Sequence, residues 1–300
     1  MAALVVPFPD DFQKPEALAD WMELTALNSA DQDASIGDVQ RELDRLNHGD
    51  RESLMGNVMT EFDRRVIATG AVAYPFERES TSIRVKSEPN KYPAYFFCLA
   101  LSYYGWKIRK RAPENPWLLF EELSFFSARS FLGNAVLFGT SSRAGTKTAN
   151  NAFKQKIENL TKVLGEGQPF TSKKTFSTQD SKLDVIAWRG FQDKRASQII
   201  ILGHCKTGPK WHLQLTELDP DAFWDQWMSG GGRGKVSRLL RSVFIPHRVF
   251  DQDEWELRAT WARLLFDRCR VVNHAHAETT SGSFADRLLL CCRTEWNLPL

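Results

Sequence analysis

The sequence predicts an α/β fold in which a small central sheet is flanked by helices and preceded by a helical N-terminal region. In the first hundred residues, apolar side chains recur mainly at helical spacing, whereas beyond about residue 116 helical segments alternate with short apolar strands. The chain of 300 residues is 42% hydrophobic, which is sufficient for a packed core.

A charged segment at residues 107–116 separates the two patterns, because it contains the basic run KIRKR and two prolines. We therefore expect two parts. Residues 1–110 form a helical region that docks a partner or regulates the protein, and residues 111–300 form the α/β domain.

Three N-terminal helices are expected, at residues 15–27, 35–46 and 92–106. Ser35 is suited to cap the second helix. The third helix is rich in aromatic residues and is expected to be buried.

The first helix of the α/β domain, residues 116–132, has the clearest boundaries. Asn115 is a typical N-cap residue, Pro116 occupies the first helical position, and Gly133 follows the last turn. Apolar residues surround most of this helix, which predicts that it is buried.

The remaining elements follow in chain order from apolar alternation, helical spacing and turn residues. They are a strand at 134–139, a helix at 148–167, strands at 182–191 and 198–208, a helix at 219–228, a strand at 239–249, a helix at 254–268, a strand at 269–275 and a closing helix at 284–296.

Two of these strands carry polar residues suited to phosphodiester chemistry. Side chains alternate across a strand, so His204 and Lys206 share one face of their strand, as Asp184 and Ile186 do of the preceding one. If the two strands pair as neighbours, the carboxylate of Asp184 and the ammonium of Lys206 converge at one end of the sheet. A carboxylate can bind Mg²⁺, which polarises a phosphate and lowers the pKa of a bound water. A nearby lysine can orient that water or stabilise charge on the phosphate.

With Asp184 in LDVIAW, the triplet HCK at residues 204–206 and a helix ahead of them, the chain resembles the PD-(D/E)xK nuclease superfamily over roughly residues 116–275. The resemblance implies a restriction-endonuclease-like core and makes residues 111–300 a nuclease domain. More loosely, the sequence resembles uncharacterised bacterial proteins encoded in phage-defence islands.

His204 departs from the pattern of the superfamily, which has glutamate or glutamine at this position. Histidine is a poorer ligand than a carboxylate for Mg²⁺ but an acceptable one for Mn²⁺. Some members take a carboxylate from the preceding helix, where this chain offers Glu121 and Glu122, and we favour Glu121. The resemblance implies that Asp184, Glu121 and the backbone carbonyl of Cys205 hold the metal while Lys206 positions the attacking water.

Basic residues suggest where nucleic acid would bind. Residues 1–65 carry 14 acidic and 6 basic side chains, whereas residues 143–174 hold seven Lys or Arg against two Glu. The candidate contacts, including two in the glycine-rich stretch SGGGRGKVSR, are Lys147, Lys154, Lys173, Lys174, Arg233 and Lys235.

The resulting hypothesis is a Mg²⁺- or Mn²⁺-dependent DNA endonuclease of bacterial antiviral defence, with RNA left open as a substrate. The alternative is a degenerate nuclease-fold subunit, in which His204 marks lost metal binding and the protein binds nucleic acid or scaffolds a complex. Expected partners are an ATPase, helicase or sensor subunit, and a second copy of the chain is left open. The absence of a long apolar run and of a cysteine framework predicts a cytoplasmic protein without a membrane partner.

Overall fold

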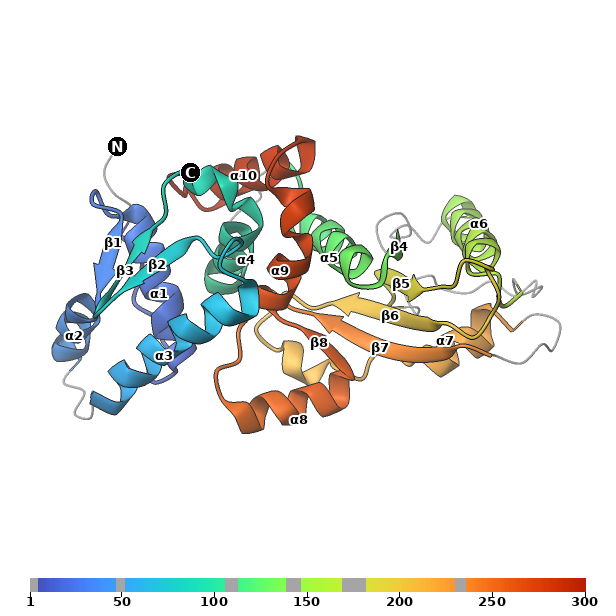
Figure 1. Cartoon of the computed structure of the whole chain (residues 1–300), viewed down its shortest axis with the longest axis horizontal. Helices are drawn as coiled ribbons and strands as arrows, with labels where there is room; N and C mark the ends of the chain where they lie inside the picture. The colour runs from blue at the N-terminus through green and yellow to red at the C-terminus, as the bar shows by residue number, and fades with distance from the viewer. Residues whose placement is uncertain (1–4, 47–51, 106–112, 139–146, 169–181, 230–235) are drawn as a thin grey trace.

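A computed structural model describes residues 5–46, 52–105, 113–138, 147–168, 182–229 and 236–300, with the side chains of 147–152 excepted. Within these residues the chain forms two sheets, one of three strands and one of five, surrounded by helices (Figure 1). The mixed α/β class predicted from the sequence is therefore confirmed. In the same part of the chain, no helix is long and apolar enough to cross a membrane.

The five-stranded sheet has the strand order β4-β5-β6-β7-β8. The first three strands run antiparallel to one another, and β7 and β8 then run parallel to β6. The strands are β4 (Asn134–Leu137), β5 (Val185–Arg189), β6 (Ile199–Cys205), β7 (Arg238–Phe244) and β8 (Leu264–Phe266).

Alternating side chains of this sheet enter two different apolar clusters. Val185, Ala187 and Ile201 pack with residues of α5 (Pro116–Leu132) and α9 (Arg268–Thr279). The residues between them, Ile186 and Leu202 among others, pack with α6 (Lys147–Leu164) and α7 (Pro220–Trp227). The two-residue period of a strand thus explains why both faces of the sheet are covered.

The helix expected at residues 116–132 is confirmed with both of its termini as α5. Asn115 Oδ1 accepts a hydrogen bond from the Trp117 N–H at 3.0 Å. Gly133 ends the helix with a φ of 91° and donates its N–H to the Arg129 carbonyl. Glycine suits this position because a side chain disfavours positive φ.

The N-terminal region is mostly helical, as expected, but it also contains a three-stranded antiparallel sheet of order β1-β3-β2 that was not predicted from the sequence. Ile83 and Val85 are buried while Arg84 between them is exposed, a short alternation that the helical spacing around it concealed. The elements are α1 (Pro15–Asn28), β1 (Asp33–Ser35), α2 (Ile36–Arg45), α3 (Glu52–Thr69), β2 (Phe76–Glu79), β3 (Ser82–Val85) and α4 (Pro93–Tyr104).

The strand expected at residues 269–275 is also wrong, since these residues lie in helix α9. Asp267 caps this helix by accepting a hydrogen bond from the Arg270 N–H, and its buried positions Val271, Val272 and Ala275 follow helical spacing. The preceding helix, α8 (Gln252–Ala262), ends earlier than expected because Arg263 adopts a φ of 67° before β8.

The largest apolar cluster extends across both predicted parts of the chain. It contains buried residues of α1, α3 and α4 together with residues of α5, α9 and α10 (Ser283–Glu295). In Figure 1 the red C-terminal helix α10 accordingly lies against α4. The expected boundary at residues 107–116 falls largely on residues 106–112, outside the described residues.

A buried network of charges joins the N-terminal helices to α9. Arg268 donates two hydrogen bonds to Asp20, at 2.8 and 2.7 Å, and Arg65 lies 2.8 Å from both Asp20 and Glu23. Both arginines are fully buried. Arg248, in the segment after β7, contacts Glu61 of α3 and Asp267 at the start of α9.

We predict that Arg268→Met lowers the free energy of unfolding by about 3–5 kcal/mol, because the Asp20 carboxylate would stay buried without its bidentate partner. Arg78→Met is a matched control, since Arg78 pairs with Asp63 on the surface at 2.8 Å and such pairs contribute about 1 kcal/mol or less. Urea unfolding measures both values. Similar small losses in the two variants would contradict the prediction.

Candidate functional site

Asp184 lies where the ends of three strands meet. It directly precedes β5, and its Oδ2 accepts a hydrogen bond from the Cys205 N–H at the end of β6, at 2.8 Å. Its own N–H donates to the Gly203 carbonyl, and its carbonyl accepts from the Phe138 N–H just after β4. The side chain therefore takes the place of a backbone acceptor at the end of the β5–β6 ladder, which fixes its carboxylate at this edge of the sheet.

Glu121 brings a second carboxylate to the same place from α5. Glu121 is only 6% exposed. Its negative charge, like that of Asp184, affects the pKa of the Cys205 thiol. The pKa of this thiol is raised well above its ordinary value, first by burial and then by the negative charges of Asp184 and Glu121. Glu122 is directed elsewhere, because its carboxylate pairs with Arg287 of α10 at 2.8 Å.

Lys206 follows β6 directly and is held by an ion pair. Its Nζ lies 2.6 Å from Oε2 of Glu217, and the Nζ of Lys182 lies 3.3 Å from the same oxygen. Burial raises the pKa of Glu217, but hydrogen bonds and charge from Lys206 and Lys182 outweigh it and leave this pKa lowered. Lys182 adopts a φ of 45° two residues before Asp184, a backbone conformation that is strained for lysine.

His204 is completely buried on β6, two residues before Lys206. Its ring nitrogens make no hydrogen bond of normal geometry among the described residues, although the backbone of Leu215 lies close to the ring. Burial, followed by the positive charge of Lys206, lowers the pKa of His204 to about 3. The imidazole is thus neutral and enclosed near physiological pH.

Three residues near Asp184 had no signal in the sequence that marked them as parts of this site: Lys156, Lys182 and Glu217. Lys156 of α6 donates a hydrogen bond to the Phe138 carbonyl at 2.7 Å, beside the backbone contact between Phe138 and Asp184. In the sequence, Lys156 is only one of seven basic residues between positions 143 and 174. Its position near Asp184 depends on how α6 packs, which the sequence does not show. Neither Glu217 nor Lys182 belongs to a recognisable spacing pattern.

Most of the expected nucleic-acid contacts cannot be placed on this structure. Lys154 is exposed on α6. Lys147 begins the same helix, but its side chain lies outside the described residues, as do Lys173, Lys174, Arg233 and Lys235.

The donor atoms around Asp184 fit a hard divalent cation. Glu121 and Asp184 supply carboxylate oxygens, which Mg²⁺ prefers. The N–H of Cys205 points toward Asp184, and because the N–H and C=O of a strand residue face the same neighbour, its carbonyl is directed to the same side. Among the described residues, no group of three or more His, Cys, Asp or Glu side chains could hold a metal, so a cation here would rely on two carboxylates, a carbonyl and water.

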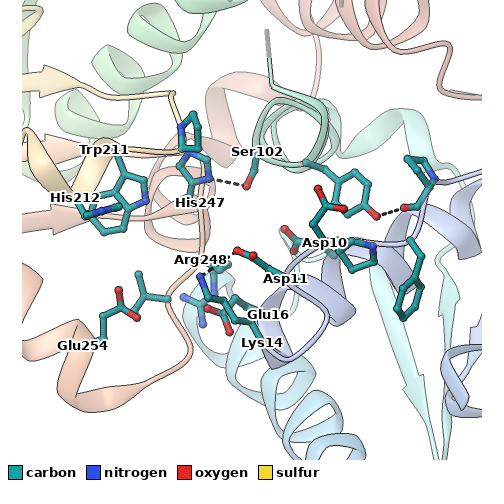
Figure 2. A pocket seen from close by; sticks show the side chains of 18 residues that line it. Asp10, Asp11, Lys14, Glu16, Ser102, Trp211, His212, His247, Arg248 and Glu254 are labelled. Atoms are coloured by element: carbon teal, nitrogen blue, oxygen red, sulfur yellow. Dashed lines mark hydrogen bonds and ion pairs between the residues drawn. The ribbon is translucent and has the colours of Figure 1, made fainter. Parts of the chain in front are cut away.

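A cavity of about 590 Å³ lies away from Asp184. Figure 2 shows it between the N-terminal segment, α1 and the residue stretches after β6 and β7, with His247 hydrogen-bonded to Ser102 at 2.9 Å. Its lining includes five carboxylates against two basic side chains, namely Asp10, Asp11, Glu16, Asp20 and Glu254 against Lys14 and Arg248. Such a surface repels a polyanion, so the carboxylates at the end of β6 remain the better candidate for phosphodiester chemistry.

No family model, curated protein or solved structure matches this chain.

We predict that replacing His204 weakens the dependence of stability on pH. The unfolded imidazole binds a proton below about pH 6.5, whereas the folded one does so only near 3, so stability falls as the pH decreases between these values. Between about pH 6.5 and pH 5 this loss is about 2 kcal/mol. Urea unfolding at about pH 6.5 and about pH 5 measures the change in the free energy of unfolding. Between these pH values His204→Gln should lose about 2 kcal/mol less of it than the wild type. Equal losses in the two proteins would show that the pKa of His204 is not lowered by folding.

Proposed function

We propose that this protein is a metal-dependent nuclease that hydrolyses phosphodiester bonds of DNA. The observation that carries the proposal is the pair of carboxylates near Cys205: Asp184 accepts a hydrogen bond from its backbone N–H, and Glu121 acts on its thiol, one residue before Lys206. The excess of basic residues after residue 65 supports a polyanionic substrate.

The order and pairing of the elements also support a restriction-endonuclease-like core. Helix α5 is followed in order by β4, α6, β5, β6, α7 and β7; β4, β5 and β6 pair antiparallel, and β7 is parallel to β6. This order of helices and strands is the one on which the sequence resemblance rests, and Asp184 and Lys206 lie at the ends of adjacent strands. A setting in bacterial defence against phage rests on the resemblance alone and stays a prediction.

In the proposed reaction, Glu121, Asp184 and the Cys205 carbonyl would hold Mg²⁺ or Mn²⁺. When bound, this cation would polarise the phosphate and acidify a water molecule. The oxygen of water forms a bond to phosphorus, the bond between phosphorus and the leaving sugar oxygen breaks, and that oxygen takes up a proton. Lys206 would orient the water or neutralise charge on the phosphate. For this its ammonium group would either leave Glu217 or contact the water or phosphate while still paired with Glu217.

Two observations favour a second function, that of a nuclease-fold subunit without catalytic activity. The ammonium of Lys206 is already neutralised by Glu217, and His204, which stands where the superfamily has a metal ligand, is enclosed in the core. Such a subunit would bind nucleic acid or scaffold a complex with a partner, without binding Mg²⁺ at Asp184.

We predict that the purified protein cleaves plasmid DNA with Mg²⁺ or Mn²⁺ and that Asp184→Asn and Lys206→Ala each lower the rate by about 100-fold or more. Gel analysis of supercoiled, nicked and linear plasmid measures the rates. Asp193→Asn, in the turn between β5 and β6, removes an exposed carboxylate and should leave the rate unchanged.

Calorimetric titration with Mn²⁺ separates the two functions. The nuclease should bind the ion and Asp184→Asn should not. Salt-sensitive DNA binding without cleavage, and without metal binding in the wild type, would instead establish the non-catalytic subunit.

A further inference from the structure

The surroundings of Lys156 differ from those of Lys206. Lys156 is half-buried on α6, and its Nζ donates to the Phe138 carbonyl at 2.7 Å while lying 5.6 Å from the centre of the Phe138 ring. The neighbouring N–H of Phe138 donates to the Asp184 carbonyl at 2.6 Å. One residue thus links the ammonium of Lys156 to the backbone of Asp184.

The negative charge of Glu121 also affects the pKa of Lys156. Burial lowers the pKa of Lys156 from its ordinary value, and the carboxylate of Glu121 is the charge that opposes this effect. Glu121 also acts on the Cys205 thiol, as Asp184 does. Lys156 is thus linked to Asp184 through the backbone of Phe138, and Glu121 is near enough for its charge to act on the pKa values of both Lys156 and Cys205.

Lys156 makes no ion pair with any residue that the structure describes, whereas Lys206 is paired with Glu217 at 2.6 Å. A backbone carbonyl is a weaker partner for an ammonium group than a carboxylate is. Of the two lysines, Lys156 thus needs less reorganisation to bind an incoming anion.

We infer that Lys156 is a second lysine of the candidate site and that its ammonium donates a hydrogen bond to a non-bridging oxygen of the scissile phosphate. This inference rests on the proposed nuclease function. In this role Lys156 approaches the phosphate from α6 and Lys206 approaches it from the end of β6, while Glu121 on α5 would hold the cation. A phosphate held from two sides is fixed in orientation for attack by water.

Lys154 provides a matched control, because it lies on the same helix and is exposed. If Lys156 contacts the phosphate in the transition state, Lys156→Ala should lower kcat for plasmid cleavage by about 100-fold to 1,000-fold. If Lys154 contacts only the DNA backbone, Lys154→Ala should raise KM and leave kcat within about threefold. Equal kcat values for the two variants would overturn the inference while leaving the nuclease function intact.

A pH profile distinguishes contact with the phosphate from a purely structural role. If Lys156 must be protonated, wild-type cleavage should fall at alkaline pH, below the range of an ordinary lysine. Lys156→Arg keeps its charge at all accessible pH, so it should retain cleavage and shift this fall upward. An inactive Lys156→Arg with an unfolding curve like that of the wild type would count against the inference, as would an unshifted profile.

A binding measurement without turnover tests the same contact. Fluorescence anisotropy of a labelled DNA duplex, in EDTA and over a series of salt concentrations, should give Lys156→Ala a salt slope smaller by about one than that of the wild type. Lys194→Ala, which removes an exposed lysine between β5 and β6, should keep the wild-type slope. An unchanged slope in Lys156→Ala would contradict the phosphate contact; if the wild type binds DNA but never cleaves it with either metal, the nuclease function fails instead.

Discussion

The buried charges between α1, α3 and α9 are the constraint on which the rest of the fold depends. Arg65 and Arg268 are fully enclosed, and their partners Asp20, Glu23 and Glu61 come from two different helices. Tyr74 and Tyr95 donate further hydrogen bonds to Glu23 at 2.7 and 2.9 Å. Because an ion buried without its partner is strongly destabilising, only a packing that satisfies all of these groups together is stable.

The buried charge network affects the candidate site because two helices, α9 and α5, lie between them. Arg268 begins α9, so its bonds to Asp20 fix that helix against the N-terminal part of the chain. Helix α9 packs along α5, and α5 carries Glu121 to the end of β6. The N-terminal region, expected from the sequence to be a separate docking or regulatory part, shares its core with the helix that supplies a carboxylate to the site.

Local signals explain which features the sequence could predict. Helix α5 was predicted with its caps because Asn115 and Gly133 act on the backbone next to them, and β4 to β7 followed from short apolar runs bounded by turns. The residues of α9 suggested a strand because Val271 and Val272 are β-branched, yet buried ion pairs and helical packing outweighed this propensity. At the site, Asp184 and Lys206 were found through their strand positions. The approach of Glu217 and Lys156 depends on tertiary packing, for which one sequence offers no spacing rule.

The charges around Asp184 suggest how substrate and cation binding would depend on each other in the proposed nuclease. Glu217 offsets one of the two positive charges of Lys206 and Lys182, so these ammonium groups attract an anion less in the resting arrangement than two free lysines would. A phosphodiester approaching Asp184 and Glu121 would meet two negative charges in a partly buried place, where repulsion is stronger than in water. The positive charge of Lys156 offsets part of this repulsion, and a divalent cation between the carboxylates would offset the rest. The cation would therefore strengthen DNA binding at this edge of the sheet, whereas contacts of DNA with exposed basic residues such as Lys154 would not depend on it.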